Sequence, residues 1–213
     1  MGNLLGKFLE DSAGNILHAR FFTYDPQGNI RIDRFYGNLT GKCQVPIQLR
    51  HHKPQHNGVE SYTKEMTYSD NAFHHLLSEK EENGKSIEYV YDPHTQQVSA
   101  KYIKDRNQIK LRQFFFYDPQ TAALVKVIKD DGTSRDSLNL DNVQERDITY
   151  ITINDHYPIG LPKVIEEKYW NQSQEVLLKR IICHYDDKGN LASQNHFDAD
   201  GVYRYTLMLM AIS

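Results

Sequence analysis

The sequence contains no long apolar run. Nowhere in its 213 residues do apolar side chains approach the roughly 18 in a row that a membrane-spanning helix needs. The N-terminal residues MGNLLGKFLEDSAGN also lack the basic, apolar and cleavage regions of a secretory signal peptide. We therefore expect no membrane span and no signal peptide in this chain.

A surplus of basic charge is also missing. The chain has 25 Lys and Arg against 28 Asp and Glu, which gives a formal net charge of -3. Proteins that bind nucleic acids or anionic membrane surfaces usually carry a basic surplus or a basic patch. Nucleic acid is therefore not an expected partner.

Cysteine is scarce. Cys43 and Cys183 lie far apart and form no CxxC pair, so neither a structural zinc site nor a disulfide scaffold is expected. Cys183 precedes His184, but neighbouring side chains on a strand diverge, and no GxSxG segment offers a serine nucleophile. Each cysteine is interpreted as a small apolar filler.

Possible metal ligands are present but poorly arranged. The densest histidines are His51, His52, His56, His74 and His75. Adjacent residues of a strand point to opposite faces, so a His-His pair cannot give both rings to one ion without a local bend. The sequence also has no HExxH segment. We predict no metal and no cofactor.

Paired carboxylates are interpreted as turn residues. The pairs are Asp130/Asp131, Asp186/Asp187 and Asp198/Asp200. They lack the alternating oxygen ligands and closing Glu of a calcium loop. A glycosidase pair would have to face across a cleft, which spacing along the chain does not establish. We therefore expect that the chain is not an enzyme.

Tyrosine and phenylalanine, in contrast, are abundant. With 14 Tyr and 9 Phe but only 39% hydrophobic residues, the composition favours strands with one wet face over helices in a dry core. Segments also alternate with period two: Ile109, Leu111 and Tyr117 are assigned to one face of a strand, and Lys110 and Arg112 to the other. The sequence therefore predicts an all-β fold.

One turn recurs along the chain. In FFTYDPQGNIRID (Phe21–Asp33), Asp25 suits the first position of a reverse turn, Pro26 presets φ at the second, and Gly28 tolerates the positive φ that follows. A partial Tyr-Ser-Asp occurs at Tyr68–Asp70, and the full Tyr-Asp pair stands at Tyr24/Asp25, Tyr91/Asp92, Tyr117/Asp118 and Tyr185/Asp186.

The turn occurs with and without glycine. Asp-x-x-Gly appears at Asp11–Ile16, Asp25–Ile30, Tyr185–Leu191 and Phe197–Val202, whereas Tyr89–Val98 and Phe115–Leu124 keep Asp-Pro without the Gly. A catalytic constellation is rarely repeated in this way, so we interpret Tyr as a packing residue and Asp as an acceptor for turn amides. The predicted structural motif comprises Tyr24, Asp25, Pro26, Gly28, Tyr91, Asp92, Pro93, Tyr117, Asp118, Pro119, Tyr185, Asp186 and Gly189.

Other turns complete a series of hairpins. Asn83-Gly84 is a strong hairpin signal. From Asp70 onward, turn centres recur about every 10 to 14 residues, which predicts consecutive antiparallel strands. Helix remains an alternative for residues 71–83 and 161–172. Residues 42–58 and 134–146 break the rhythm and are predicted to be loops or insertions.

The Tyr-Asp turns, their spacing of about 22 residues and the run of hairpins make the chain resemble the bacterial RHS or YD-repeat family. That family includes polymorphic toxins, insecticidal toxin complexes and the related teneurins. The resemblance implies a strip of hairpins that spirals into a hollow shell, which holds a C-terminal toxin effector and does not catalyse a reaction. It also implies a secreted or cell-surface protein, with the remaining shell and the effector domain as partners.

The sequence departs from that family where the shell would end. The aspartate-rich core segment that can release the effector has no counterpart before GVYRYTLMLMAIS, so no protease residues are carried over. We expect one region over residues 1–213, forming a curved, open arc of a shell whose free edges favour self-association. The alternative function is a surface-exposed module that binds carbohydrate or protein through Tyr and Trp170.

Overall fold

Every regular element is a β-strand in the computed structural model, which describes residues 2–42, 45–51, 53–55, 58–154, 160–171 and 174–208. The strands are β1 (Gly6–Glu10), β2 (Ile16–Tyr24), β3 (Ile30–Gly37), β4 (Leu49–Arg50), β5 (Lys53–Pro54), β6 (Glu60–Tyr68), β7 (Leu76–Glu81), β8 (Lys85–Tyr91), β9 (Val98–Asp105), β10 (Gln108–Tyr117), β11 (Leu124–Asp130), β12 (Arg146–Ile153), β13 (Pro162–Trp170), β14 (Glu175–Tyr185), β15 (Leu191–Asp198) and β16 (Tyr203–Met208).

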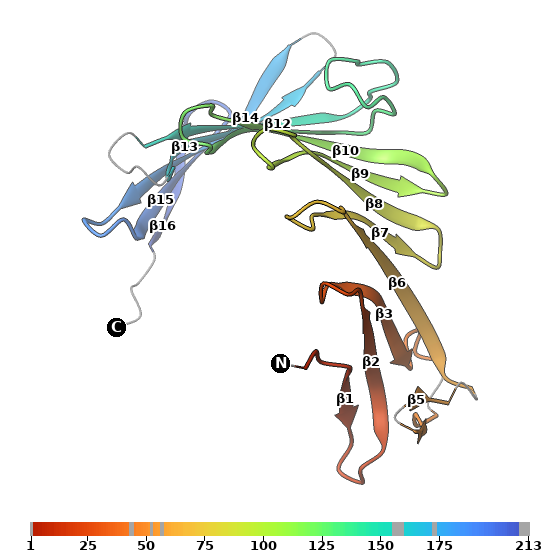
Figure 1. Ribbon diagram of the computed structural model, residues 1–213. Helices are drawn as coiled ribbons and strands as arrows, with labels where there is room; N and C mark the ends of the chain where they lie inside the picture. Colours follow the sequence, from red (N-terminus) through yellow and green to blue (C-terminus); the bar gives the residue numbers. More distant parts are fainter. Residues whose placement is uncertain are drawn as a thin grey trace. The chain divides into compact units, whose positions relative to one another are not determined.

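Fourteen of these strands form one sheet whose spatial order follows the chain, from β1 through β2, β3 and β6 to β16 (Figure 1). Strands β4 and β5 form a separate hairpin. Because β1 and β16 are the two ends of the order and do not pair with each other, the sheet is open. The predicted all-β array of antiparallel hairpins in an open sheet is confirmed.

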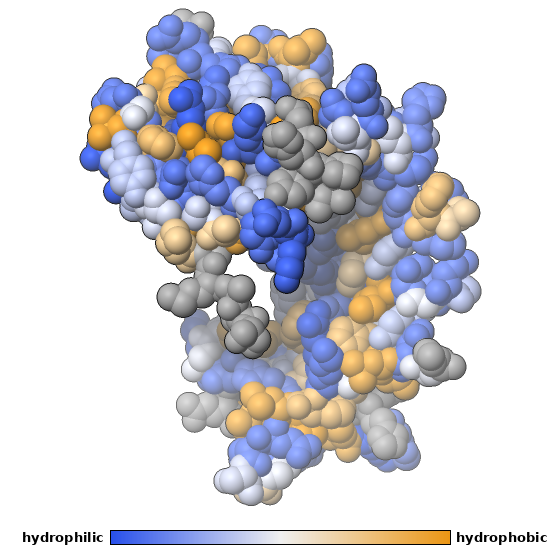
Figure 2. Space-filling view, turned by 90° about the vertical axis from the view of Figure 1, so that its left-hand side faces the viewer, coloured by the Kyte–Doolittle hydropathy of each residue, from blue (hydrophilic) through white to orange (hydrophobic). Residues whose placement is uncertain are grey.

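The chain divides into two compact units. The first unit comprises Met1–Glu88 with Asp105–Asn107, and the second comprises Tyr89–Lys104 with Gln108–Ser213. Apolar side chains are interspersed with hydrophilic ones on the face seen in Figure 2, as expected for a sheet that exposes much of its surface.

Both segments for which a helix was an alternative contain strands. Residues 71–83 include β7, which pairs with β6 and β8, and residues 161–172 include β13, which pairs with β12 and β14. Ile165 of β13 lies directly between Ile151 and Ile181 on the neighbouring strands. Cross-strand packing of this kind outweighs a modest helix propensity.

The core of the first unit joins the sheet to the connection between β3 and β6. Ala19 and Tyr36 lie opposite each other on β2 and β3, and buried Ile47 packs against them. The amide of Ile47 also donates a 2.8 Å hydrogen bond to the carbonyl of Ile16. Residues 42–58 therefore contain a short hairpin and a sheet anchor, while Cys43, His52 and His56 lie outside the described residues.

The core of the second unit consists of rows of directly opposed residues. One row contains Phe114, Ile128 and Ile148 on β10, β11 and β12. The next row on the same face contains Arg112, Asp130 and Arg146, all of them buried. The alternation placed Arg112 on the face opposite Ile109, Leu111 and Tyr117, and at Arg112 this face is buried because the connection between β11 and β12 covers it.

Successive turns alternate between two edges of an antiparallel sheet, and this divides the turns into two groups within each unit. In the first unit, the turns after Tyr24 and Tyr68 share one edge, and in the second unit those after Tyr91, Tyr117 and Tyr185 do so. We call this side of the sheet, where one end of every strand lies, the Tyr-Asp edge. It is distinct from the two edge strands, β1 and β16. The turns that begin at Asp11 and Asp198 lie on the opposite edge of their units.

Candidate functional site

Each turn aspartate organises its own backbone. The Oδ1 atom of Asp25 accepts hydrogen bonds from the amides of Gln27 (3.0 Å) and Asn29 (2.8 Å), and its Oδ2 accepts one from the Asn29 side chain (2.9 Å). Asp11 and Asp186 accept the same set from their own turns. One carboxylate thereby satisfies three donors that the turn leaves free.

These hydrogen bonds favour the ionised carboxylate. At Asp186, the side chain of Asn190 makes the largest contribution and lowers the pKa below its ordinary value, with a further contribution from the Asn190 amide. At Asp25, burial raises the pKa, but the bonds from Asn29, Gln27 and Gly28 outweigh it and the net pKa is lowered. A carboxylate held in its ionised form is a poor general acid near neutral pH.

The residue three places after the aspartate selects between two turns. In the glycine form, Gly28 has φ of +90° and Gly189 has φ of +81°, and the Asp25 amide bonds the carbonyl of Asn29. Where Thr95 replaces the glycine, it donates to Asp92 through its amide (2.8 Å) and its hydroxyl (3.2 Å). The closing bond then runs from Asp92 to Gln97, so this turn is one residue longer.

The threonine form places positive φ on ordinary residues. Gln96 has φ of 61°, and Ala122 has φ of 58° in the equivalent turn after Asp118. Thr121 donates to Asp118 as Thr95 does to Asp92. The forms without glycine are thus a second turn type with its own signal, Asp-Pro-x-Thr, rather than shortened copies of the first.

The tyrosine side chain joins its turn to the preceding strand. Its hydroxyl donates to the backbone carbonyl at or just before the start of that strand: Tyr24 to Leu4 (2.5 Å), Tyr68 to Ile30 (3.0 Å), Tyr117 to Val98 (3.0 Å) and Tyr185 to Pro162 (2.8 Å). The strand register also shifts directly before each of these tyrosines. Such a bulge re-aims a side chain, here along the edge of the sheet.

Burial disfavours ionisation of the hydroxyl groups of Tyr68, Tyr91, Tyr117 and Tyr185. It is the largest cause that raises the pKa of Tyr68, Tyr91 and Tyr117, and it raises the pKa of Tyr185 to about 12. A protonated hydroxyl is needed to donate to a carbonyl. The Tyr-Asp pair therefore has two separate tasks: Asp shapes one turn, and Tyr fastens that turn to the preceding hairpin.

Two turns in which no tyrosine precedes the aspartate lie on the opposite edge of the sheet. Glu10 precedes Asp11, and Phe197 precedes Asp198, although both aspartates accept amide hydrogen bonds like Asp25. Both turns lie opposite the Tyr-Asp edge of their unit. Where a turn begins with an aspartate directly after its strand, a tyrosine before that aspartate marks the Tyr-Asp edge.

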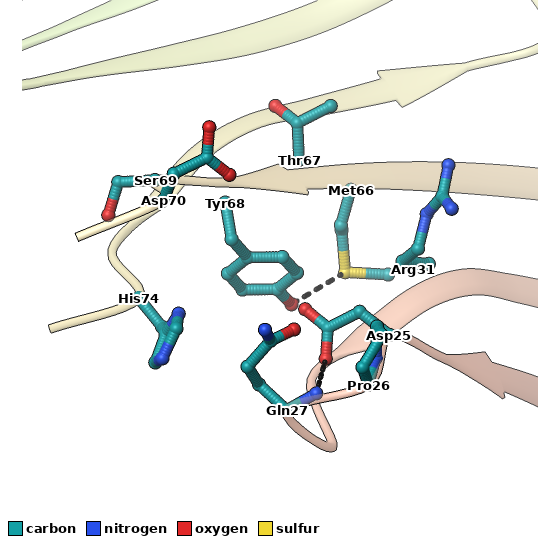
Figure 3. Close-up of a pocket in the computed structure, with 10 residues that line it drawn as sticks. All are labelled: Asp25, Pro26, Gln27, Arg31, Met66, Thr67, Tyr68, Ser69, Asp70 and His74. Carbon is teal, nitrogen blue, oxygen red and sulfur yellow. Dashed lines mark hydrogen bonds between the residues drawn. The ribbon is translucent and has the colours of Figure 1, made fainter. Parts of the chain in front are cut away.

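The turns of the Tyr-Asp edge also border clefts. In the first unit, a cleft of about 340 Å³ lies between the Asp25 turn and the turn between β6 and β7 (Figure 3). Tyr68 lies beside Met66 and near Asp25, while His74 lines another part of the cleft. A second cleft of about 310 Å³ lies between the Asp92 and Asp118 turns in the second unit, lined in part by Pro119.

Groups that could support other chemistry are dispersed. Within the described parts of the chain, no three His, Cys, Asp or Glu residues come together as metal ligands would. His51 is exposed, and His75 stacks on Phe73 at a centroid distance of 5.4 Å. Over the same residues, no helix has the length and apolar character to cross a membrane.

Asp130 accepts the Gly132 amide at 3.1 Å, as a turn aspartate does, but it also has a second role that the interpretation of paired carboxylates did not include. Its carboxylate forms a buried ion pair with Arg112, whose side chain is fully buried, and it lies 3.6 Å from the Arg146 guanidinium. Asp131 instead accepts loop amides, including that of Gln144 at 2.9 Å. A Cβ atom added at Gly132 would lie 2.6 Å from the Arg112 guanidinium, so only glycine leaves room for it.

No family model matches the sequence, and no curated protein matches it either. The fold is similar to part of a chain in the crystal structure of TcdB2-TccC3-TEV, with a TM-score of 0.53 and 17% sequence identity. It is also similar to part of a chain in the Tc holotoxin pore of Photorhabdus luminescens with a mutation in TccC3, with a TM-score of 0.55 and 16% identity. Each match covers 94% of this chain but only 9% of the other. The chain therefore shares its fold with a short segment of Tc toxin components.

Proposed function

We propose that the chain is a non-catalytic scaffold segment of the RHS/YD-repeat type, part of a shell that encloses or carries a C-terminal toxin effector. The observation that carries this proposal is the single open sheet in which each hairpin follows the last and tyrosines fasten neighbouring hairpins together. Fold similarity to Tc toxin chains over 94% of this chain supports it. The expected partners are the remaining shell and the effector, in a secreted or cell-surface protein.

An open sheet of consecutive hairpins is suited to form the wall of a shell. A strand in the interior of the order pairs on both sides, so the sheet can extend by further hairpins without a new core for each one. Tyrosine bonds along one edge add a second link between hairpins beyond the strand pairing. A non-catalytic role fits the lowered pKa of the turn aspartates, since their carboxylates are already engaged by the backbone.

The direct test uses the complete native protein that contains this segment, purified from the cells that make it and digested with trypsin. A shell predicts that a C-terminal polypeptide copurifies and resists digestion until mild denaturation opens the sheet. Mass spectrometry of the fragments over time gives the readout. Simultaneous digestion of all segments, or a protein without a further polypeptide, would contradict the carrier role.

A second candidate function is a carbohydrate-binding module. The cleft in Figure 3 favours it, because the Tyr68 ring, Pro26 and the polar side chains of Gln27 and Ser69 are a combination that suits a sugar. A glycan array with the purified chain tests this function. Binding that is reduced by Gln27→Ala and not by Gln174→Ala would support it, and no signal at high micromolar concentration would exclude this candidate.

Self-association is expected if the isolated chain keeps free sheet edges. Strands β1 and β16 each pair on one side only, and unpaired backbone groups are templates for another strand. Light scattering of the purified chain should therefore show a mass that rises with concentration. A constant monomer mass would contradict open edges in solution.

A further inference from the structure

One leucine of the second unit is unusually exposed. Leu138 has 85% of its surface exposed, more than any other large hydrophobic residue in the parts of the chain that the structure describes. It lies in the connection between β11 and β12, residues 131–145, on the edge opposite the Tyr-Asp edge of that unit. We call this connection the 131–145 loop.

The loop is held in place on both sides of Leu138. Arg112 donates to the carbonyls of Ser134 (2.7 Å), Asp136 (2.7 Å) and Asn139 (2.6 Å). Two further bonds hold the intervening backbone: Tyr102 donates to the carbonyl of Arg135 (3.1 Å), and Arg146 to that of Ser137 (2.8 Å). The backbone around Leu138 is thus fixed by three buried side chains.

The fixed loop backbone lowers the entropic cost of binding a partner through Leu138. Isolated apolar residues on a protein surface are ordinary, and a flexible loop loses conformational entropy when it binds. Here the buried Arg112 has already fixed the conformation, so a partner that receives Leu138 meets little of this cost. Residues 131–145 contain four acidic residues and one arginine, so the loop that carries the leucine has an excess of negative charge.

The first unit has a cleft of matching character. A cleft of about 220 Å³ is lined by the apolar side chains of Phe8, Tyr36 and Leu39, with Lys7 and Arg20 among its other residues. Lys7 is exposed, and the Arg20 side chain is 42% exposed although it pairs with Asp33. An apolar cleft beside basic side chains complements a leucine on an acidic loop.

We propose that Leu138 of one copy of the chain inserts into this cleft on a second copy. Because the two surfaces differ, the contact is heterologous, and it joins copies head to tail. The contact is independent of the carrier role and of pairing between sheet edges. It assigns a binding role to the 131–145 loop and to the cleft around Leu39.

The test is sedimentation velocity of the purified chain from about 1 to 100 µM, where Leu138→Asp should weaken self-association at least about tenfold, as for a central hot-spot residue. Leu39→Asp should weaken it to a similar extent from the other side of the contact. Leu178→Asp is the matched control, because Leu178 is an exposed leucine (46%) of the same unit outside both surfaces. Circular dichroism checks that each variant is folded.

Charge reversal then tests the pairing itself. Lys7→Asp and Asp141→Lys should each weaken self-association, and the double variant should restore it. Self-association unchanged in Leu138→Asp would overturn the proposal and assign the contact to the sheet edges. A chain that stays monomeric up to 100 µM would overturn it as well.

Discussion

The two edges of the sheet differ in what their turns contain. On the Tyr-Asp edge of each unit, Tyr68, Tyr117 and Tyr185 bond the preceding strand, and the aspartates shape short turns. On the opposite edge, Asp11 and Asp198 shape similar turns without a tyrosine before them. The repeated sequence feature therefore belongs to one edge and not to the hairpin as a whole.

The two edges also differ in the length of their connections. The connections between β3 and β6 and between β11 and β12 are the long ones, and each lies opposite the Tyr-Asp edge of its unit. Each has its own anchor: Ile47 packs on Ala19 and Tyr36 in the first unit, and Arg112 holds the 131–145 loop in the second. On the Tyr-Asp edge, Tyr117 and Tyr185 bond the preceding strand, whereas on the opposite edge Tyr102 bonds the long connection itself, at the carbonyl of Arg135.

The largest expected effect comes from removing the buried anchor of the opposite edge. Arg112→Met leaves the Asp130 carboxylate buried with Arg146 alone, which should lower the free energy of unfolding by about 3 to 5 kcal/mol. Urea denaturation measures this loss, and limited proteolysis should cut first within residues 131–145. Arg180→Met is the control, since its pair with Glu166 is exposed and should contribute less than about 1 kcal/mol.

A smaller loss is expected on the Tyr-Asp edge. Tyr117→Phe keeps the ring but removes the hydrogen bond to Val98, which should lower the free energy of unfolding by about 1 kcal/mol. Tyr169→Phe, at the opposite edge with a ring that is 37% exposed, should change it little. Equal effects of the two substitutions in urea denaturation would argue against a special role for this edge.

A gain in stability is expected at the longer turn. Ala122 has φ of 58°, a conformation that glycine adopts without strain, so Ala122→Gly should raise the free energy of unfolding by up to about 1 kcal/mol. Ala13 lies in the Asp11 turn and is absent from the residues with positive φ, so Ala13→Gly should lower stability slightly. Thermal unfolding of both variants gives the comparison, and destabilisation by Ala122→Gly would contradict the role of φ.

The smallest effects on stability are expected from pH. The aspartate of a Tyr-Asp pair makes stability fall at low pH, and the tyrosine makes it fall at high pH. The lowered pKa of Asp25 and Asp186 gives stability that is present above the unfolded-state pKa of about 4 and lost as pH falls through the folded value. The raised pKa of Tyr185, about 12, gives stability that is present below about pH 10 and lost as pH rises towards 12. Raising the pH from about 10 to 12 should therefore lower the denaturant midpoint of the wild type more than that of Tyr185→Phe.

The sequence was most informative where the structure depends on neighbouring residues. The φ of Gly28 and the amide bonds to Asp25 follow from a five-residue segment, and both were expected from turn chemistry. The positive φ of Ala122 was not expected, because it depends on the longer turn that the Thr121 bonds to Asp118 fix. The strand identity of residues 162–170 depends on partners on both sides, which local propensity does not contain.

Long-range contacts account for what was missed. The tyrosine bond from Tyr68 to Ile30 spans 38 residues, and nothing within the turn indicates its acceptor. Arg112 alternates with apolar residues as an exposed side chain would, and only the loop that covers it makes its face buried. Gly132 is the one local sign of this arrangement, because its missing side chain leaves space for the guanidinium.

The central claim is that the tyrosine hydroxyl fastens the turn that follows it to the preceding strand, as at Tyr24, Tyr117 and Tyr185, and native-state hydrogen exchange of Tyr117→Phe tests it most directly. We predict faster exchange in the Asp118–Ala123 turn and at the beginning of β9, with protection in β14 and β15 unchanged. Exchange identical to wild type, or a uniform increase across the sheet, would contradict it.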